Sequence, residues 1–295
     1  MPRQTGDNRL GAFFWIPTAW IVLVVVSALT ADLWPVPEPD RMDWDYLTAM
    51  PGTPTATAMI KQAKDGETAD YVYLLGTDTM GRDILSRSIH GARISLSVGL
   101  MAPLVGLLIG GFLGCLAGYY RGSAESVIIA TMDIILAFPG LVLLLAMAFF
   151  LGPTLPNLIA ALGFLSIPAF CRVARAKTLA LSDLSFIEAA RLTGAGSLSI
   201  LFREIVPNVV IPLSVYGLLV AAFMIMAEGA LSFLGLGLPP PTPSWGGMIA
   251  EGKEVLEEAP HVSMIPAAVM FFTVIAFNLL GDSLRQRFER GDSQI

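Results

Sequence analysis

Long runs of residues without charge alternate with short charged segments along the chain, and these runs predict membrane-spanning helices. A helix needs about 20 mostly apolar residues to cross the hydrocarbon core of a bilayer. Uncharged runs of 22, 27 and 23 residues lie at 10–31, 94–120 and 259–281. Each of these runs predicts one span.

Two longer runs hold the remaining spans. Asp133 is the one charged residue between positions 126 and 171, and the sequence GPTLPN at 152–157 supplies a turn that divides this run into two helices. Glu228 is the one charged residue between 205 and 250, where a single helix fits before the prolines of GLGLPPPTPSWGG. The sequence therefore predicts an all-α integral membrane protein with six transmembrane helices.

These spans divide the chain into three parts. Residues 1–90 hold an N-terminal tail, the first span and an extracytoplasmic segment. Residues 91–282 form a core of five helices with a cytoplasmic loop at 172–207, and residues 283–295 form a cytoplasmic tail.

Lysine and arginine between the spans predict the orientation, because cytoplasmic loops carry an excess of these residues. Most of them lie in the two tails, the second loop and the fourth loop, whereas the two short loops on the other side contain only Lys253. Both termini are therefore expected in the cytoplasm. The sequence SALTA resembles a signal-peptide cleavage site, but the apolar part of a signal peptide has about 7 to 15 residues and this run is longer, so we expect an uncleaved span.

Composition supports a membrane protein, since 55% of the residues are hydrophobic and 14% are charged. Membrane lipid is the expected surrounding. The net charge of −6 argues against nucleic acid as a partner, because phosphate binding requires a concentrated basic surface. Cys115 and Cys171 lie inside apolar runs and show neither a disulfide framework nor the spacing of a metal site.

Glycines recur every four residues in the second span and predict a close helix contact. Small residues at this spacing line one face and let two backbones approach. We favour packing within the same chain over a contact with another subunit. The four positions are Gly106, Gly110, Gly114 and Gly118.

The segment before the second span has two parts. Residues 34–71 are rich in proline and acidic residues and predict irregular, solvated chain. The following sequence GTDTMGRDILSRSIHGARISL predicts a periplasmic interfacial helix that lies along the membrane surface before the span begins, with Asp83 and Arg87 placed to pair across one turn.

The segment SFIEAARLTGAGSLSILFREIVPN concentrates charge and helix signals between the fourth and fifth spans. Ser185 and Glu188 have the spacing of a capping box, which predicts the start of a short helix. Gly194 suits the left-handed conformation that ends helices. Ser197 predicts the cap of a second short helix, and Pro207 marks the beginning of the fifth span. Two capped helices outside the bilayer form a surface to which another protein can bind.

Five segments resemble one protein family. EAARLTG with a proline thirteen residues after its glycine, LGTDTMGRDILSRSIHGARISLSVG, DIILAFPGLVLLL, EGALSFLGLGLPPPTPSWGGMI and NLLGDSLRQR resemble permease subunits of dipeptide and oligopeptide ATP-binding-cassette importers, specifically the C-type subunit. The resemblance covers about residues 71–288. Glu204 and the tail RQRFERGD depart from the family pattern.

The resemblance implies a type I importer permease fold in the bacterial inner membrane, with cytoplasmic coupling helices. It implies a heterodimer with a homologous permease subunit, two cytoplasmic ATPase subunits and an extracytoplasmic solute-binding protein. The sequence contains no G-x-x-x-x-G-K-[ST] motif, so ATP and Mg²⁺ are expected in the partner ATPases, and no cofactor is expected on this chain. The same family pattern serves dipeptides, longer peptides and nickel chelates.

In such a family the cytoplasmic loop docks into a cleft of the ATPase. The resemblance implies that Glu188, Ala189, Ala190 and Gly194 transmit movement. It implies a polar contact for Arg191, and it places the ends of the docking segment at Ser185 and Pro207.

Charged residues within the spans are candidates for the transport pathway or a gate, because ionisable groups in a membrane are expensive and usually functional. Glu228 fits either this role or that of a buried glutamate hydrogen-bonded to neighbouring helices. For Asp133 we favour a structural contact facing the bundle. Pro139, just beyond it, is expected to bend the third span.

Two other classes fit less well. A membrane-embedded enzyme needs a polar catalytic set, and the sequence has neither H-E-x-x-H nor G-x-S-x-G. An ion-driven secondary transporter is expected to show several intramembrane charges or related halves, and here only Asp133 and Glu228 qualify.

Overall fold

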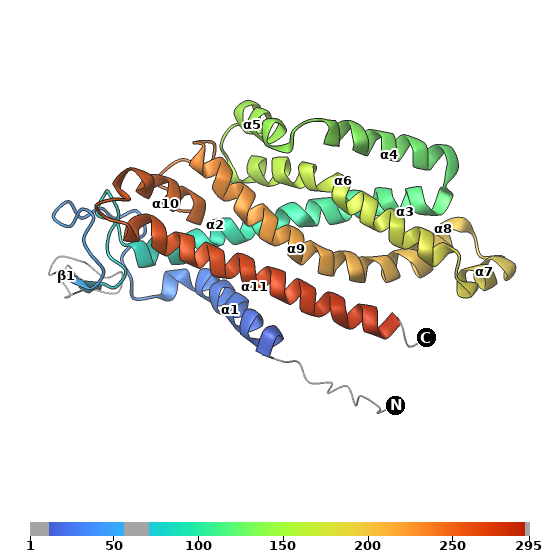
Figure 1. Ribbon diagram of the computed structural model, residues 1–295, viewed down its shortest axis with the longest axis horizontal. Helices are drawn as coiled ribbons and strands as arrows, with labels where there is room; N and C mark the ends of the chain where they lie inside the picture. Colours follow the sequence, from blue (N-terminus) through green and yellow to red (C-terminus); the bar gives the residue numbers. More distant parts are fainter. Residues whose placement is uncertain (1–11, 56–70, 293–295) are drawn as a thin grey trace.

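A computed structural model describes residues 12–55 and 71–292 of the chain. It is a bundle of long helices, with a small hairpin at one end and a short helix at the other (Figure 1). The hairpin pairs β1 (Thr53–Thr55) with β2 (Tyr71–Tyr73), and the short helix is α7 (Ser185–Leu192). We call the two ends of the bundle the hairpin end and the α7 end. The predicted N-terminal tail and residues 56–70 of the outer segment lie outside the described residues.

Four continuous helices are long and apolar enough to cross a membrane. Two of them contain a π-helical turn. The first is α2 (Ile84–Val105), η2 (Gly106–Gly110) and α3 (Gly111–Tyr120); the second is α6 (Leu155–Ser182); the third is α8 (Ser197–Ile200), η3 (Leu201–Ile205) and α9 (Val206–Phe233); and the fourth is α11 (His261–Asp292).

Two further crossings are shorter or broken. Helix α1 (Ala12–Leu29) has 18 residues and is about 27 Å long at 1.5 Å per residue. Helices α4 (Gly122–Ala137) and α5 (Gly140–Leu151) form an apolar pair bent by 83°. If α1 and this pair each cross once, the bundle has the six spans predicted from the sequence.

The break between α4 and α5 lies at Pro139, where the sequence predicts a bend. Phe138 has extended backbone angles of φ −81° and ψ 135°, as expected for a residue that precedes proline. The helix therefore ends at Ala137 and restarts at Gly140. The bend of 83° is a full interruption of the span.

The predicted interfacial helix is wrong as a separate element. Residues 84–120 form one continuous helix, so the segment expected along the membrane surface is the first part of the second span. Asp83 caps this helix and accepts hydrogen bonds from the backbone N–H of Ser86 at 3.0 Å and of Leu85 at 3.4 Å. The predicted pair of Asp83 with Arg87 is also wrong, because the carboxylate is occupied by these free amides.

The outer segment is more ordered than its composition predicts. A 3-10 turn η1 (Ala31–Leu33) leads from α1 into this segment, and β1, in its described part, pairs antiparallel with β2, with Pro54 opposite Val72. The backbone N–H of Thr48 donates to the carbonyl of Asp78 at 2.9 Å. A proline-rich and acidic composition does not reveal such long-range backbone bonds, which fix this segment on the chain just before α2.

The core lies where α2, α3, α6 and α9 meet, around fully buried residues such as Leu162, Phe170 and Leu213. The predicted glycine face lies at this contact. A Cβ atom at Gly110 would collide with the carbonyl of Ile167, and Cβ atoms at Gly106, Gly114 and Gly118 would collide with other residues of α6. The glycines therefore allow α2, η2 and α3 to pack backbone to backbone on α6.

Candidate functional site

Helix α7 projects from the end of the bundle after α6 (Figure 1). Its first residue is Ser185, and the N-cap position belongs to Leu184, which has extended backbone and no side-chain cap. The predicted capping box is therefore wrong, because the side chain of Ser185 lies one position inside the helix. The carbonyl of Leu184 accepts the first bond, from the N–H of Ile187 at 3.1 Å.

The end of α7 has the predicted glycine geometry. Gly194 has φ +83°, the left-handed region that residues with a Cβ rarely adopt. Its N–H donates to the carbonyl of Arg191 at 3.0 Å, and the N–H of Ala195 donates to the carbonyl of Ala190 at 3.0 Å. These bonds satisfy the last carbonyls of the helix and turn the chain back toward the bundle.

The second short helix predicted in this loop is wrong as an independent element. Gly196 occupies the N-cap position in place of Ser197, with no side-chain bond. From Ser197 the chain is helical without interruption to Phe233. The π-helical turn η3 ends two residues before Pro207, whose ring and missing amide N–H interrupt regular α-helical bonding. The docking segment thus consists of α7, a turn, and the first helical turns of the fifth span, which begins at Ser197.

The faces of α7 differ in burial. Ile187 is completely buried and Ala190 packs on the core, whereas Ser185, Glu188, Ala189, Arg191 and Gly194 are exposed. The helix is therefore anchored by Ile187 on one side and exposed on the other, where the guanidinium of Arg191 also contacts the ring of Tyr119.

Sequence reasoning missed the apolar residues at the tip of this end. Leu192 is 84% exposed and Leu198 is 63% exposed, on the two sides of the turn. They add apolar area to the exposed surface of α7 and the turn that follows it. The signal in the sequence is the presence of these two leucines inside a charged cytoplasmic loop.

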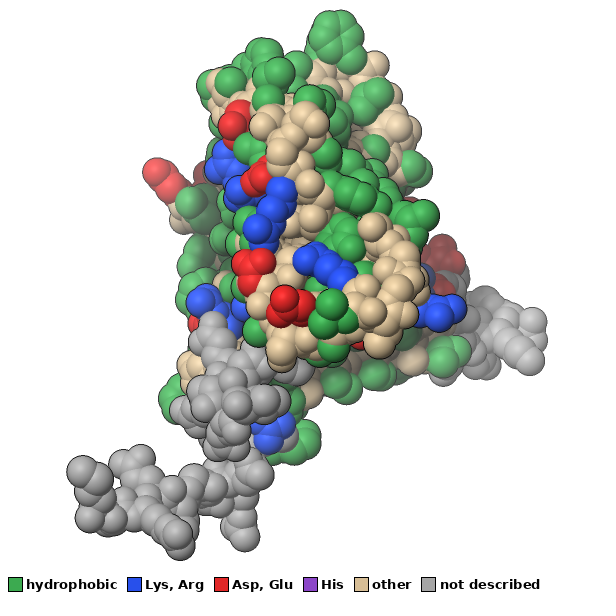
Figure 2. Space-filling view, turned by 90° about the vertical axis from the view of Figure 1, so that its right-hand side faces the viewer, with side chains coloured by type: hydrophobic (Ala, Val, Ile, Leu, Met, Phe, Trp, Pro, Cys, Tyr) green, Lys and Arg blue, Asp and Glu red, His purple; other side chains and the backbone are tan. Residues whose placement is uncertain are grey.

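Ion pairs surround the α7 end, where Figure 2 shows basic and acidic side chains close together. Arg121 pairs with Asp183 at 2.7 Å, which ties the connection between α3 and α4 to the end of α6. Arg175 pairs with Glu125 and joins α6 to the first turn of α4. The charges thus hold several helices together at the end that carries α7.

Asp133 makes the expected structural contact, since it pairs with Arg172 of α6 at 2.6 Å, but its side chain does not face the interior of the bundle. Both side chains of the pair are 54% exposed. The neighbouring Met132 fills the contact between α4 and α6 together with Ile128 and other apolar residues. Asp133 is therefore left at the edge of this contact.

Glu228 lies fully buried where α2, α9 and α10 (Trp245–Gly252) meet. Its carboxylate accepts hydrogen bonds from the hydroxyls of Ser232 at 2.8 Å, Ser244 at 2.9 Å and Ser95 at 3.3 Å. Of the two roles considered for this residue, these contacts correspond to the buried structural one. The carboxylate joins the start of α10 to two spans.

A buried ionic cluster at the hairpin end was not found from the sequence. Arg82 pairs with Asp78 at 2.7 Å and with Glu251 at 2.6 Å, and Arg87 pairs with Glu251 at 3.2 Å. Both arginines are almost completely buried. The cluster joins the turn before α2 to α10, which are far apart in the sequence.

Asp83 lies beside this cluster and is buried. The hydroxyl of Tyr71 donates to it at 3.0 Å. Burial raises the pKa of Asp83 to about 6, although its hydrogen bonds act in the opposite direction. Burial likewise raises the pKa of Tyr71.

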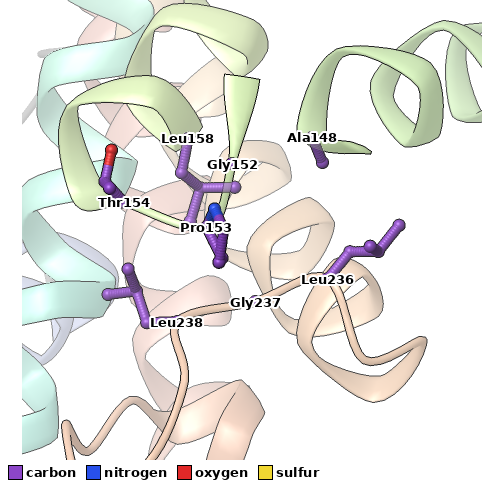
Figure 3. A pocket seen from close by; sticks show the side chains of 8 residues that line it. All are labelled: Ala148, Gly152, Pro153, Thr154, Leu158, Leu236, Gly237 and Leu238. Atoms are coloured by element: carbon purple, nitrogen blue, oxygen red, sulfur yellow. The ribbon is translucent and has the colours of Figure 1, made fainter. Parts of the chain in front are cut away.

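A small cavity lies between two connections at the hairpin end (Figure 3). Gly152, Pro153 and Thr154 line it from the turn after α5, and Leu236, Gly237 and Leu238 from the chain after α9. Its volume of ≈ 10 Å³ has room for about one water molecule. It is too small for a transported solute.

Comparison with protein families gives a match over most of the chain. Residues 110–291 match the family described as the binding-protein-dependent transport system inner membrane component. This range contains α3, the whole loop around α7 and the fifth and sixth spans.

Similar curated proteins are bacterial permeases. The glutathione transport system permease protein GsiD of Pectobacterium atrosepticum is 45% identical over 73% of this chain and 71% of its own length. The di/tripeptide transport system permease protein DppC of Pseudomonas aeruginosa is 39% identical over 92% of this chain and 85% of its own length. GsiD of Escherichia coli is 39% identical over 91% of this chain and 83% of its own length.

Solved structures with a similar fold are also transporters. An inward facing conformation of the MetNI methionine ABC transporter superposes with a TM-score of 0.57 at 19% identity, over 69% of this chain and 97% of that chain. An amino acid ABC transporter gives a TM-score of 0.50 at 19% identity, over 69% of this chain and 94% of that chain. At this identity the similarity concerns the fold.

Proposed function

This chain belongs to the family of inner membrane components of binding-protein-dependent transport systems, and we propose that it imports short peptides as one permease subunit of an ATP-driven importer. In this family ATP hydrolysis is carried out by separate subunits, and a solute-binding protein delivers the substrate. The chain itself provides part of the passage through the membrane.

The proposal that the substrate is a peptide rests on how much of the chain is similar in sequence to peptide permeases. The similarity covers 92% of this chain for a protein named for di- and tripeptides. Relatives named for glutathione agree in chemistry, because glutathione is a tripeptide with free amino and carboxyl groups. The proposed substrate class is therefore a short peptide with charged ends.

We infer that α7 and the turn to Ser197 are the contact with the ATPase. The exposed side of α7 carries Glu188, Ala189 and Arg191, while Ile187 fixes the helix to the core. A force applied to α7 therefore reaches the spans without a flexible linker. ATP and Mg²⁺ act in the ATPase. ATP can shift the equilibrium between two conformations of the transporter only by the difference in its affinity for them.

The proposed assembly has a homologous permease subunit beside this chain, two ATPases at the α7 end and the solute-binding protein at the hairpin end. The first residues of α1 and the last residues of α11 lie toward the α7 end (Figure 1). Arg121, Arg172, Arg175 and Arg191 also lie in this half of the bundle. An excess of basic residues supports a cytoplasmic position of this end and of both termini.

Uptake into vesicles tests the proposed function. Proteoliposomes that contain the permease pair and the ATPases, supplied with the solute-binding protein, are expected to take up labelled dipeptide or glutathione only when ATP is present on the ATPase side. Uptake driven by an ion gradient without ATP would contradict the proposal. ATP-driven uptake of a nickel chelate but not of a peptide would retain the importer and overturn the substrate class.

A further inference from the structure

A groove of about 300 Å³ lies between α6 and α9, halfway along both helices. Its volume is at the lower limit of ligand-binding pockets, about 300 Å³. Apolar side chains form most of its surface. It is lined among others by Leu165, Ser166 and Ala169 of α6 and by Tyr216, Val220 and Phe223 of α9.

The exposed ion pair of Asp133 and Arg172 lies next to this groove. Leu165, Ala169 and Arg172 are four and three residues apart, so they share one face of α6. Arg172 therefore continues the α6 wall of the groove by one turn toward the α7 end. From there its guanidinium reaches Asp133 on α4 at 2.6 Å.

Charge exposed on a transmembrane helix indicates that this face does not meet lipid. A charged side chain in contact with hydrocarbon is expensive, and such residues face protein or a water-filled passage. Both side chains of the pair are 54% exposed. Because α4 and α6 both belong to apolar spans, this exposed pair is expected to face protein or a water-filled passage and not hydrocarbon.

We propose that the groove between α6 and α9 and the pair Asp133–Arg172 form a peptide-binding subsite in the transport pathway. The carboxylate of Asp133 would accept from the ammonium end of a short peptide. The guanidinium of Arg172 would donate to its carboxylate end. The apolar groove would hold side chains of the peptide. This inference rests on the proposed import of peptides.

Charge complementarity favours a peptide over other occupants of the groove. A lipid acyl chain offers no partner to either charge, and an apolar helix of the homologous subunit would cover the pair without bonding to it. A short peptide carries the two complementary charges and brings apolar side chains with them. The surface between Phe223 and Ala169 is apolar and contains the adaptable side chain of Met224, which suits varied peptide side chains.

Cysteine labelling in the assembled importer tests the subsite. Cys115 and Cys171 are buried, so an introduced cysteine provides the accessible thiol among the described residues. The variant Ala169→Cys is treated with a charged, membrane-impermeant methanethiosulfonate, with and without the dipeptide or glutathione that the same vesicles import. We expect modification that the peptide slows. The control Phe271→Cys, on a 57% exposed position of α11, is expected to stay unmodified by the charged reagent.

A second pair of variants tests the role of the charges. In the Ala169→Cys background, Arg172→Gln is expected to raise the peptide concentration for half-protection about tenfold, as for the loss of one charged hydrogen bond. The matched control Arg121→Gln breaks the pair with Asp183 outside the groove and is expected to leave protection unchanged.

Three results would overturn the subsite. The charged reagent would fail at Ala169→Cys if lipid or a helix of the homologous subunit fills the groove, and a hydrophobic maleimide would then distinguish lipid from a helix. Modification that peptide does not slow would exclude peptide binding. Equal protection in Arg172→Gln and Arg121→Gln would exclude the charged contact. ATP-driven uptake in the unmodified importer tests the proposed function separately. Failure of the proposed function can therefore be distinguished from failure of the subsite.

Discussion

Arg191 of α7 places its guanidinium 5.7 Å from the centre of the Tyr119 ring at the end of α3. This contact joins the exposed helix of the α7 end to the second span. Together with buried Ile187, it gives α7 two attachments to the bundle, one polar and one apolar. A movement of α7 is therefore expected to reach α3 as well as α6.

Replacing Tyr119 by leucine is expected to weaken the coupling between ATP hydrolysis and transport. The cation–π contact contributes about 0.5–1 kcal/mol at an exposed site, and its loss frees one attachment of α7. The ratio of peptide uptake to ATP hydrolysis should fall, while the ATPase stays bound. Tyr120→Leu is the matched control, since Tyr120 is 46% exposed and makes no cation–π contact with Arg191 in the described structure. Equal behaviour of the two variants would contradict this prediction.

Gly194→Val is expected to weaken attachment of the ATPase. Gly194 has φ +83° and open space around it, so the cost comes from the backbone alone, about 1 kcal/mol or more for a β-branched residue. Gly196→Val is the matched control, because Gly196 also has open space but a φ of −67°. Co-purification of the ATPase should fall in the first variant and persist in the second. Undiminished co-purification in Gly194→Val would count against the role of this turn.

Gly110→Ala is expected to destabilise the bundle, since the added methyl group meets the backbone of Ile167. Overpacking of this kind costs about 1–3 kcal/mol. Gly111→Ala is the control, because its Cβ would make an ordinary contact of 3.5 Å with Leu213. Thermal unfolding of the purified subunit in detergent should separate the two variants. The contact between η2 and α6 would be misassigned if both variants unfold at the same temperature.

Glu228→Leu is expected to lower the stability of the subunit, because three serine hydroxyls lose their common acceptor. Each unsatisfied buried group costs about 1–3 kcal/mol. Glu228→Gln keeps an acceptor and should retain most of the thermal stability and of the peptide uptake. Loss of uptake in Glu228→Gln with unchanged thermal unfolding would instead indicate a role in the pathway.

Asp83 predicts a pH dependence of the hairpin end. Its pKa in the folded protein, about 6, lies above the value of 3.8 for the free side chain. Stability from this group is therefore complete below pH 3.8 and is lost as the pH rises through 6. Asp83→Asn keeps a good N-cap residue that does not ionise. The melting temperature of the variant, relative to the natural protein, should rise between pH 5 and pH 7.5. A difference independent of pH would contradict the raised pKa.

The sequence predicted the elements that depend on local pattern. Charged residues at the ends of uncharged runs located the spans, and the repeat of Gly110 and its neighbours located a close contact. The conformation of Gly194 and the interruption at Pro139 follow from properties of single residues, which is why both could be foreseen.

The remaining features depend on contacts between distant segments. Arg82 and Glu251 are separated by 169 residues, so no local pattern indicates their pair. The surface helix was predicted from the charges of Arg82, Asp83 and Arg87, but these groups are buried by the outer segment and α10. At Ser185 and Ser197 the pattern of a cap was present, but each serine is the first residue of its helix, so the helices begin one residue earlier than the pattern requires.

The central claim is that α7 is the contact through which a separate ATPase acts on this chain. Cross-linking of Ala189→Cys in the assembled importer tests it most directly, since Ala189 is exposed on α7 and both natural cysteines are buried. A thiol cross-linker of short reach should join Ala189→Cys to the ATPase, whereas Leu74→Cys, 59% exposed at the hairpin end, should give no such product. A cross-link to the ATPase from Leu74→Cys, or none from Ala189→Cys in an importer that hydrolyses ATP, would contradict the claim.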